Sequence, residues 1–498
     1  MPSEKKISTP FGDAILDTDS DSDTTSKKNN KKKSLSAKSK QEVTPFGIAD
    51  VDSDDSSEIE NNQQIPYSYP LEKYKIVKKS GYVAEPKGTQ WLHDRQKDDE
   101  LGNKEIKLAT IVEKLMNMEY PEQRSDAWFA LRRDKITASD VGSAIGDNPY
   151  ELPYRFLIKK VWELPFRGAK NCHHGTKYEN IATAIYEYRR NVKVEEFGLI
   201  AHPKHIVAAS PDGIVGKYKL DGTSLTKYVG RMLEIKCVVG RQIKKFGDIK
   251  GNQCPIYYWD QVQTQLECCD LAECDFWQCK IVEYDSKESF INDTDVNEPF
   301  RSKSNGLEKG CLLQFLPHEK YTEVANGKYE KVLYDTAKFC HPPKIEMTPY
   351  DCDIWISQCM ANIDSICPKD YYFDRIKYWK LVESHCCVVE RNKKWFADSL
   401  PILEKMWNYV VFFRNNKEQA EILQKYVEIF IKIFIPEDEE EEQKDKKEEI
   451  KINEKVMRVV DILYNTPNQK NITEVKEYNS KIKKIKDRIE KQSKDIVS

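Results

Sequence analysis

The feature that most restricts the fold of this chain is a run of short β-strand patterns in residues 197–239. The segment 197–216 predicts two short strands, and the second strand carries a Ser-Pro-Asp-Gly sequence that includes Asp212. Asp221-Gly222 is a strong signal for a two-residue turn. The apolar residues after this turn therefore predict the return strand of a β-hairpin.

The predicted return strand places a carboxylate and an amine on the same side. Because side chains alternate along a β-strand, Glu234 and Lys236 share one face, while the apolar residues between them occupy the other. Asp212 precedes Glu234 by 22 residues (234 − 212), a separation that one hairpin can bridge. The hairpin can therefore bring all three polar side chains together.

Two neighbouring carboxylates repel each other unless a cation lies between them. Oxygen ligands, with few His and Cys residues nearby, are typical of magnesium rather than zinc. A lysine on the same face can hold or deprotonate a metal-bound water, whose pKa the metal lowers. The trio therefore predicts either a site for phosphodiester hydrolysis or an ordinary strand with a Glu–Lys pair, and the residues alone leave both open.

Two predicted helices could add polar groups to such a site. The helix predicted over residues 173–190 has Glu179 beside its apolar stripe, where the side chain either enters a cleft or lies on the surface. The helix predicted over residues 254–270 has Gln261 and Gln265 at helical spacing. An amide on that face either positions a water or a phosphate, or is an ordinary surface group.

The segment 124–146 predicts a helix, then Thr137 and Ser139, then a second helix capped by Ser139 or Asp140. A helix N-terminus with free N–H groups, two hydroxyls and a nearby arginine can hold a phosphate. The alternative is an ordinary helix cap.

The composition limits the class of protein. Of the 498 residues, 39% are hydrophobic and 32% are charged, so we expect part of the chain to be unfolded. The net charge of −3 neither indicates nor excludes a nucleic-acid partner. The 14 cysteines lack zinc-ribbon spacing and predict free thiols in a reducing, intracellular compartment. No apolar run approaches the ~18 residues of a membrane span.

The first 65 residues are rich in Ser, Asp, Lys and Asn and predict a disordered tail. Within it, a Thr-Pro-Phe-Gly motif followed by acidic residues and serines occurs twice, from Thr9 and from Thr44. The repeat is either a duplicated disordered segment or a pair of docking motifs tuned by phosphorylation.

Taken in order, these segments resemble the lambda-exonuclease, or YqaJ-like viral recombinase, branch of the PD-(D/E)xK nucleases. The resemblance rests on five motifs in the order and nearly the spacing of that family: DAWFALRRDKITAS, HGTKYE, SPDG, LEIKC and YYWDQVQ. It covers about residues 120–285, and residues 385–407 are similar to the terminal strand and helix of the family. His174, where an aromatic residue is usual, is a departure that removes no ligand.

The resemblance implies an α/β fold with a restriction-endonuclease-like mixed β-sheet flanked by helices. The predicted regions are the disordered tail (1–65), a lead-in with one helix (66–117), the nuclease domain (118–435), a charged linker (436–449) and a charged helix (450–498). Within the nuclease domain, we expect the core at 120–285, an insertion at 286–375, and the terminal strand and helix at 376–415.

The resemblance also implies roles for the polar residues. Mg²⁺ is the implied cofactor, with Mn²⁺ as a substitute. The implied metal ligands are Asp212, Glu234, the Ile235 carbonyl and Glu179. Lys236 would orient or activate the water, and Gln261 would lie beside it, so that the implied catalytic set is Glu179, Asp212, Glu234, Lys236 and Gln261. The implied ligands of a 5′-phosphate are Arg132, Thr137, Ser139 and Ser210.

The function that follows from the resemblance is 5′→3′ digestion of double-stranded DNA ends in viral-type recombination or repair. The implied partners are DNA ends, a single-strand annealing protein and two further copies in a ring-shaped trimer. A nuclear, viral replication or virion location would suit this role. A structure- or sequence-specific endonuclease and a non-catalytic DNA-binding module are the alternatives.

Overall fold

The computed structural model describes residues 43–44, 47–48, 101–121, 125–164, 170–434, 446–466 and 472–497. The predicted tail, with its duplicated motif, lies outside the described residues except for one antiparallel pair of short strands, β1 (Val43–Thr44) and β2 (Gly47–Ile48). Most of the predicted lead-in and most of the predicted linker also lie outside them.

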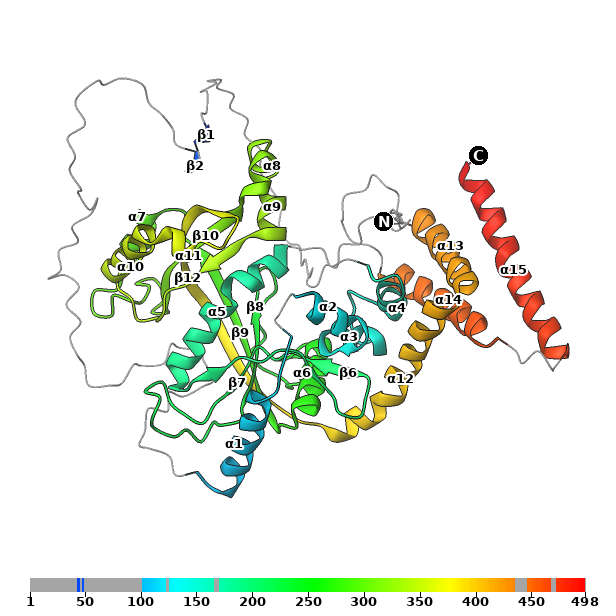
Figure 1. Cartoon of the computed structure of the whole chain (residues 1–498), viewed down its shortest axis with the longest axis horizontal. Coiled ribbons are helices and arrows are strands. Elements are labelled where there is room, and N and C mark those ends of the chain that lie inside the picture. Colours follow the sequence, from blue (N-terminus) through cyan, green and yellow to red (C-terminus); the bar gives the residue numbers. More distant parts are fainter. Residues whose placement is uncertain are drawn as a thin grey trace, which may run out of the picture.

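A seven-stranded sheet forms the centre of the described part, in the order β11-β10-β12-β9-β8-β7-β4. Among these strands β8 and β9 are parallel, and the other neighbours are antiparallel. The sheet is flanked by helices (Figure 1), which confirms the predicted α/β class with a mixed sheet. Its strands are β4 (Val194–Glu195), β7 (Gly213–Val215), β8 (Met232–Cys237), β9 (Glu273–Glu283), β10 (Lys309–Pro317), β11 (Lys338–Cys340) and β12 (Tyr371–Glu390).

A second, three-stranded sheet is built from β3 (Ile136–Thr137), β6 (Val207–Ala209) and β5 (Ile200–Ala201). The second strand predicted within residues 197–216 is therefore wrong as one element, because β6 and β7 belong to different sheets. The break falls at Pro211, which has no N–H group to continue a ladder. Asp212 consequently lies where the chain crosses from one sheet to the other.

Strand β8 is covered on both faces. Helix α5 (Lys170–Arg190) packs on one face and helix α6 (Ile256–Cys269) on the other (Figure 1). Tyr178, Ile181 and Ile185 of α5 are buried with Leu233 and Ile235. Val262 and Leu266 of α6 pack with Met232. Alternation along β8 thus sends its odd-numbered side chains to α5 and its even-numbered side chains to α6.

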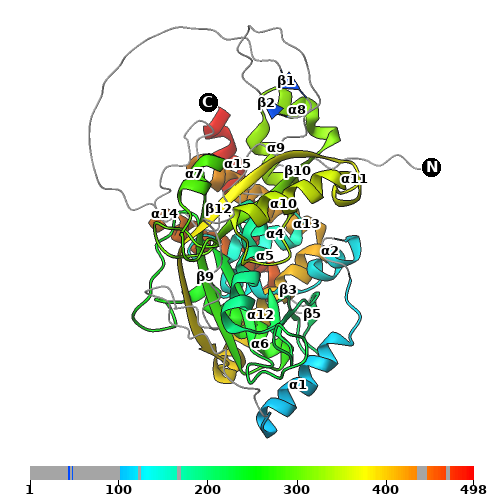
Figure 2. The ribbon, with the colours of Figure 1, turned by 90° about the vertical axis from the view of Figure 1, so that its left-hand side faces the viewer.

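Among the described residues, four helices precede α5, and α1 extends from the body at one end in two perpendicular views (Figures 1 and 2). They are α1 (Asn103–Met116), α2 (Asp126–Arg133), α3 (Ala138–Ile145) and α4 (Pro153–Val161). Helix α3 packs against α6. Its N-cap residue is Thr137, so the predicted caps Ser139 and Asp140 instead lie in its first turn.

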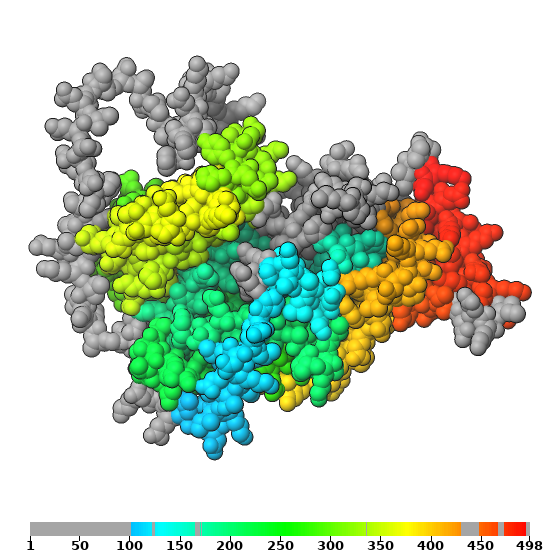
Figure 3. Space-filling view, in the orientation of Figure 1, coloured from blue at the N-terminus to red at the C-terminus, as the bar shows by residue number. Residues whose placement is uncertain are grey.

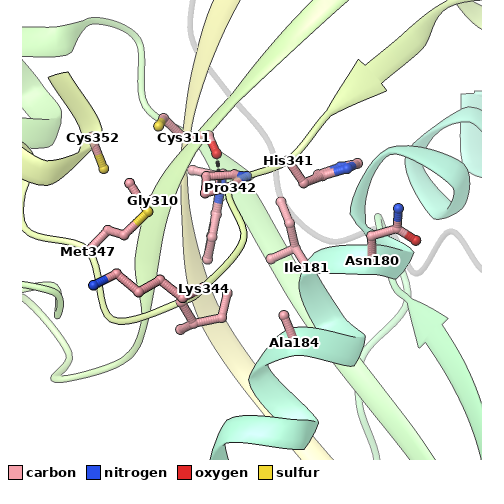
Figure 4. A pocket seen from close by; sticks show the side chains of 12 residues that line it. Asn180, Ile181, Ala184, Gly310, Cys311, His341, Pro342, Lys344, Met347 and Cys352 are labelled. Carbon is pink, nitrogen blue, oxygen red and sulfur yellow. Dashed lines mark hydrogen bonds between the residues drawn. The ribbon is translucent and has the colours of Figure 1, made fainter. Parts of the chain in front are cut away.

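Residues 286–375, predicted as an insertion, add β10 and β11 to one edge of the main sheet. This region packs against α5, with the His341 Nε2 atom 2.9 Å from the Lys177 carbonyl, and a small pocket remains between them, lined by Asn180, Ile181 and Ala184 of α5 and by Cys311 and His341 (Figure 4). The helices here are α7 (Lys287–Asn292), the 3-10 turn His318–Lys320, α8 (Tyr321–Ala325), α9 (Tyr329–Thr336), α10 (Pro349–Ala361) and α11 (Ile363–Ile366).

The last four described helices are α12 (Lys393–Asn415), α13 (Lys417–Phe434), α14 (Lys446–Tyr464) and α15 (Ile472–Val497). The single charged helix predicted over residues 450–498 is wrong, because two helices flank Pro467, which cannot continue a helix interior. Both pack on α13, at the opposite end of the molecule from residues 286–375 (Figure 3). No helix in the described ranges is long and apolar enough to cross a membrane.

Candidate active site

The crossing between the two sheets places Asp212 beside β8. Gly213 pairs with Leu233 across β7 and β8, and the Asp212 Oδ2 atom accepts a hydrogen bond from the Ile235 N–H group at 2.6 Å. The predicted turn is present at Asp221, whose carboxylate accepts hydrogen bonds from two following N–H groups. The hairpin therefore brings Asp212 to the strand that carries Glu234, as its pattern predicted.

Glu234 is the centre of the cluster, and only 1% of its surface is exposed. Its Oε1 atom lies 2.7 Å from the Lys236 Nζ atom and accepts a hydrogen bond of 2.7 Å from the Gln261 amide. Its Oε2 atom accepts a hydrogen bond of 2.7 Å from the Gln265 amide. Gln261 and Gln265 thus both face β8. The predicted site set omitted Gln265, although its spacing from Gln261 indicated a shared helix face.

The cluster carries more negative than positive charge. Burial, together with the carboxylates of Glu234 and Glu179, raises the pKa of Asp212 well above its usual range, and Lys236 opposes this only in part. Glu179 is an exposed residue of α5, yet its charge acts on both Asp212 and Cys237. The structure therefore brings these three carboxylates near Lys236, an arrangement that a bound cation would stabilise.

The donor set suits a hard cation that keeps most of its water. In the ranges that the structure describes, no group of three His, Cys, Asp or Glu side chains is placed to hold a metal by itself. Magnesium is commonly bound by one or two carboxylates with several waters kept in its coordination sphere. The pair Asp212 and Glu234 fits that mode. The 14 cysteines are free thiols in the structure and contribute no ligand to this pair.

A second polar cluster surrounds the start of α3. The Thr137 Oγ1 atom donates a hydrogen bond of 2.7 Å to the Asp140 Oδ2 atom and lies 3.1 Å from the Ser139 Oγ atom. Arg132 stacks on the Trp128 ring, with its guanidinium carbon 4.4 Å from the ring centroid. The structure thus gathers the predicted arginine and two hydroxyls, but Asp140 also occupies their centre.

Two lysines of α4 pair with that carboxylate, and Lys159 also lies 2.7 Å from the buried Glu151, so that Arg132 carries the remaining positive charge of the cluster. The Nζ atoms of Lys159 and Lys160 lie 3.0 and 2.9 Å from the Asp140 carboxylate oxygens. Burial alone would raise the pKa of Asp140, but Lys159, Lys160 and Arg132 lower it well below its usual range. The predicted phosphate site lacked these lysines, because a Lys-Lys pair on a helix gives no signal in the sequence that its charges point inward.

The two clusters are neighbours through the small sheet. Strands β3 and β6 are parallel, and Thr137 pairs with Ala208. Ser210 follows two residues after Ala208 and precedes Asp212 by two residues. The pairing of β3 with β6 therefore places Thr137 next to the segment that leads through Ser210 to Asp212.

The fold and the site together define an α/β protein in which two carboxylates and a lysine gather where two sheets meet. Residues 127–272 match the family described as the YqaJ-like viral recombinase domain, which confirms the resemblance that the motifs predicted. Residues 127–272 are therefore similar to the YqaJ-like viral recombinase domain.

The chain is similar to two viral proteins. It is 39% identical over 339 residues to protein R354 of Acanthamoeba polyphaga mimivirus, covering 68% of this chain and 61% of that protein. It is 30% identical over 169 residues to a protein of African swine fever virus (strain Badajoz 1971 Vero-adapted), covering 29% of this chain and 46% of that protein. The chain thus spans less than two thirds of the length of either relative.

A solved structure with similarity to the chain is an alkaline exonuclease from Laribacter hongkongensis. The match covers 60% of this chain and 98% of that protein, with 16% sequence identity and a TM-score of 0.30.

Proposed function

We propose that this protein is a metal-dependent nuclease that digests double-stranded DNA from its ends, in the 5′→3′ direction. The observation that carries the proposal is the cluster of Asp212, Glu234 and Lys236, in which the carboxylates outnumber the cations. The YqaJ-like viral recombinase domain supports the same activity.

In this proposal Asp212, Glu234 and the Ile235 carbonyl hold Mg²⁺, with Mn²⁺ as a substitute, and Glu179 faces a second cation. Bound Mg²⁺ supplies a Lewis acid and lowers the pKa of a coordinated water. Lys236 holds or deprotonates the attacking water. The 2.7 Å hydrogen bond from Gln261 orients the Glu234 carboxylate and keeps the amide beside the water.

The cluster at the start of α3 would hold the terminal 5′-phosphate. Arg132, Thr137 and Ser139 surround a carboxylate that Lys159 and Lys160 already neutralise. An incoming phosphate would therefore meet surplus positive charge and two hydroxyls. With Ser210 between the clusters, an end bound at one cluster would present its first phosphodiester to the other, which favours an end-directed enzyme.

The wider role is proposed from the same resemblance. The match to the viral recombinase family supports a place in recombination or repair of DNA, and the two viral relatives support a viral setting, in the nucleus, a viral replication compartment or a virion. A ring-shaped trimer that encloses DNA and a single-strand annealing partner would suit such an enzyme. The division of the chain into tail, nuclease domain, insertion and charged C-terminal region likewise stays a prediction.

The test uses linear duplex DNA labelled at either end, with Mg²⁺, and with or without a 5′-phosphate. We expect the 5′-phosphorylated strand to shorten from its 5′ end and closed circular DNA to stay intact. Cleavage of closed circles would replace the proposal with the endonuclease alternative. Binding without cleavage in Mg²⁺ or Mn²⁺ would leave only the non-catalytic DNA-binding module.

A further inference from the structure

The connection between β8 and α6, residues 238–255, joins the two elements that hold Glu234. At its tip Phe246 is 84% exposed, the highest value among the large apolar side chains of the described residues. Exposing a whole aromatic ring to water is unfavourable. A ring presented so close in sequence to Lys236 therefore needs an explanation other than packing.

The tip that carries Phe246 is anchored rather than loosely attached. The Gln253 amide donates a hydrogen bond of 2.8 Å to the Gly247 carbonyl, and the Gln253 Oε1 atom lies 2.8 Å from the His385 Nε2 atom of β12. The Gln278 amide of β9 donates to the Gln253 carbonyl at 3.0 Å. Gly247 has a φ of +94°, a conformation that favours glycine. The main sheet thus anchors the backbone next to Phe246 through Gln253.

The residues around the ring are basic. Residues 241–250 contain four Lys or Arg residues and one acidic residue, Asp248, a net charge of +3 (4 − 1). Lys245 is paired with Glu383 at 2.8 Å, and the Lys250 Nζ atom lies 4.1 Å from the Trp259 ring centroid. An exposed aromatic ring among basic residues is the combination with which proteins bind single-stranded nucleic acid, since bases stack on the ring and phosphates meet the cations.

Arg241 connects this loop to the active site. Its guanidinium carbon lies 5.9 Å from the centroid of the Tyr258 ring, and the Lys236 Nζ atom lies 4.3 Å from the same centroid. The Nε and Nη2 atoms of Arg241 are buried and have no hydrogen-bond partner among the described residues. Buried charged donors without partners are costly. A phosphate oxygen beside the site would satisfy them.

We propose that Phe246 stacks on an unpaired base of the DNA beside the active site, while Arg241 holds a phosphate of the same strand. The inference rests on the proposed function for its ligand, DNA, but not on cleavage. It makes the β8–α6 connection a substrate-binding loop that keeps a frayed end near Asp212 and Lys236.

The test measures binding in EDTA, so that no cleavage is needed. The probe is a duplex with a single-stranded end that carries the fluorescent base 2-aminopurine, whose emission falls when the base stacks on an aromatic ring. We expect Phe246→Ala to weaken binding about 10-fold or more and to abolish the quenching, and Phe246→Trp to restore both. Val296→Ala, which shortens an exposed apolar side chain in the insertion, is the matched control and should behave as the wild type.

Arg241→Gln tests the second part of the inference, the contact of Arg241 with a phosphate, separately from stacking on Phe246. We expect it to weaken binding at low salt and to reduce the slope of log affinity against log salt by about 1, while saturated complexes stay quenched. Unchanged binding and quenching by Phe246→Ala would overturn the inference and leave the nuclease proposal intact. Quenching by a wild-type protein that does not cleave in Mg²⁺ would support the inference and overturn the nuclease proposal instead.

Discussion

The clusters around Asp212 and around Asp140 bury carboxylates in opposite electrostatic surroundings. Asp212 lies near two further carboxylates and one lysine, and its pKa is raised. Asp140 lies near two lysines and Arg132, and its pKa is lowered. Burial by itself would raise both, so the neighbouring charges decide the difference.

The difference indicates what each cluster can bind. The cluster around Asp212 has too little positive charge and would be stabilised by a cation, whereas the cluster around Asp140 has a cation to spare and would be stabilised by an anion. A DNA end with Mg²⁺ supplies both. Since β3 pairs with β6, which leads to Ser210 and Asp212, the proposed function expects the two to bind side by side.

The largest expected effect comes from removing Asp212, the carboxylate that would bind the metal in the proposed function. Asp212→Asn should lower nuclease activity on end-labelled duplex by about 10³-fold or more, because metal activation contributes several kcal/mol to the transition state. The matched control is Asp221→Asn, an exposed carboxylate at the tip of the same hairpin. Full activity in Asp212→Asn would refute the site.

Asp140→Asn tests the cationic surroundings of Asp140 through their effect on the stability of the folded protein. Removing the Asp140 charge leaves the buried Lys160 without its carboxylate, while Lys159 keeps Glu151, so the free energy of unfolding in urea at pH 7 should fall by about 3 kcal/mol. Asp134→Asn, on an exposed carboxylate, should cost less than about 1 kcal/mol.

The same variant has a defined pH dependence. Because the folded-state pKa of Asp140 is lowered, its stabilisation is present above the unfolded-state pKa of about 3.9 and is lost as the pH falls through the folded-state pKa. The stability difference between the wild type and Asp140→Asn should therefore be full near neutral pH and shrink in acid. A difference that grows in acid would contradict the ion-pair assignment.

Arg132→Gln tests whether the surplus cation is used for the DNA end. The preference for a 5′-phosphorylated over a 5′-hydroxyl end, measured from initial rates, should fall about 10-fold, the value of one charge-assisted hydrogen bond. Arg133→Gln alters the adjacent, more exposed arginine and should keep the preference. An equal loss in both variants would indicate a general effect of charge.

The smallest effect is expected at a third buried carboxylate, Asp260 of α6. Burial raises its pKa to about 8, together with the nearby Asp147 charge and a side-chain hydrogen bond between the two carboxyl groups, and Lys250 opposes this only in part. At neutral pH the Asp260 carboxyl group therefore carries a proton, which removes the charge that a bound cation would otherwise compensate. The folded state then holds a proton that the unfolded state has released, so the stability of the wild type should fall as the pH rises toward 8.

Asp260→Asn removes this dependence. Between pH 7 and pH 9 the wild type should lose about 1 kcal/mol of unfolding free energy that the variant keeps, as measured by urea denaturation at a series of pH values. Parallel pH profiles for the two proteins would show that Asp260 is ionised at neutral pH.

Much of the site followed from local patterns. The alternation in residues 231–239 predicted that Glu234 and Lys236 share a face, and the helical spacing of α6 predicted that Gln261 and Gln265 point the same way. Both patterns depend on geometry that repeats within a few residues. Pro211 and Pro467 are sequence signals against a continuous strand and a continuous helix, and the predicted elements that ran through them were wrong.

By itself, the sequence determined which side chains share a face on β8, α5 and α6, because strand and helix periods are local properties of the backbone. Only the tertiary structure decided what surrounds each charge. The contacts of Asp140 with Lys159, of Glu234 with Gln265, and of Arg241 with Tyr258 join residues 17 to 31 positions apart (258 − 241 and 265 − 234). Electrostatic compensation depends on such distances in space, which no periodicity in the sequence encodes.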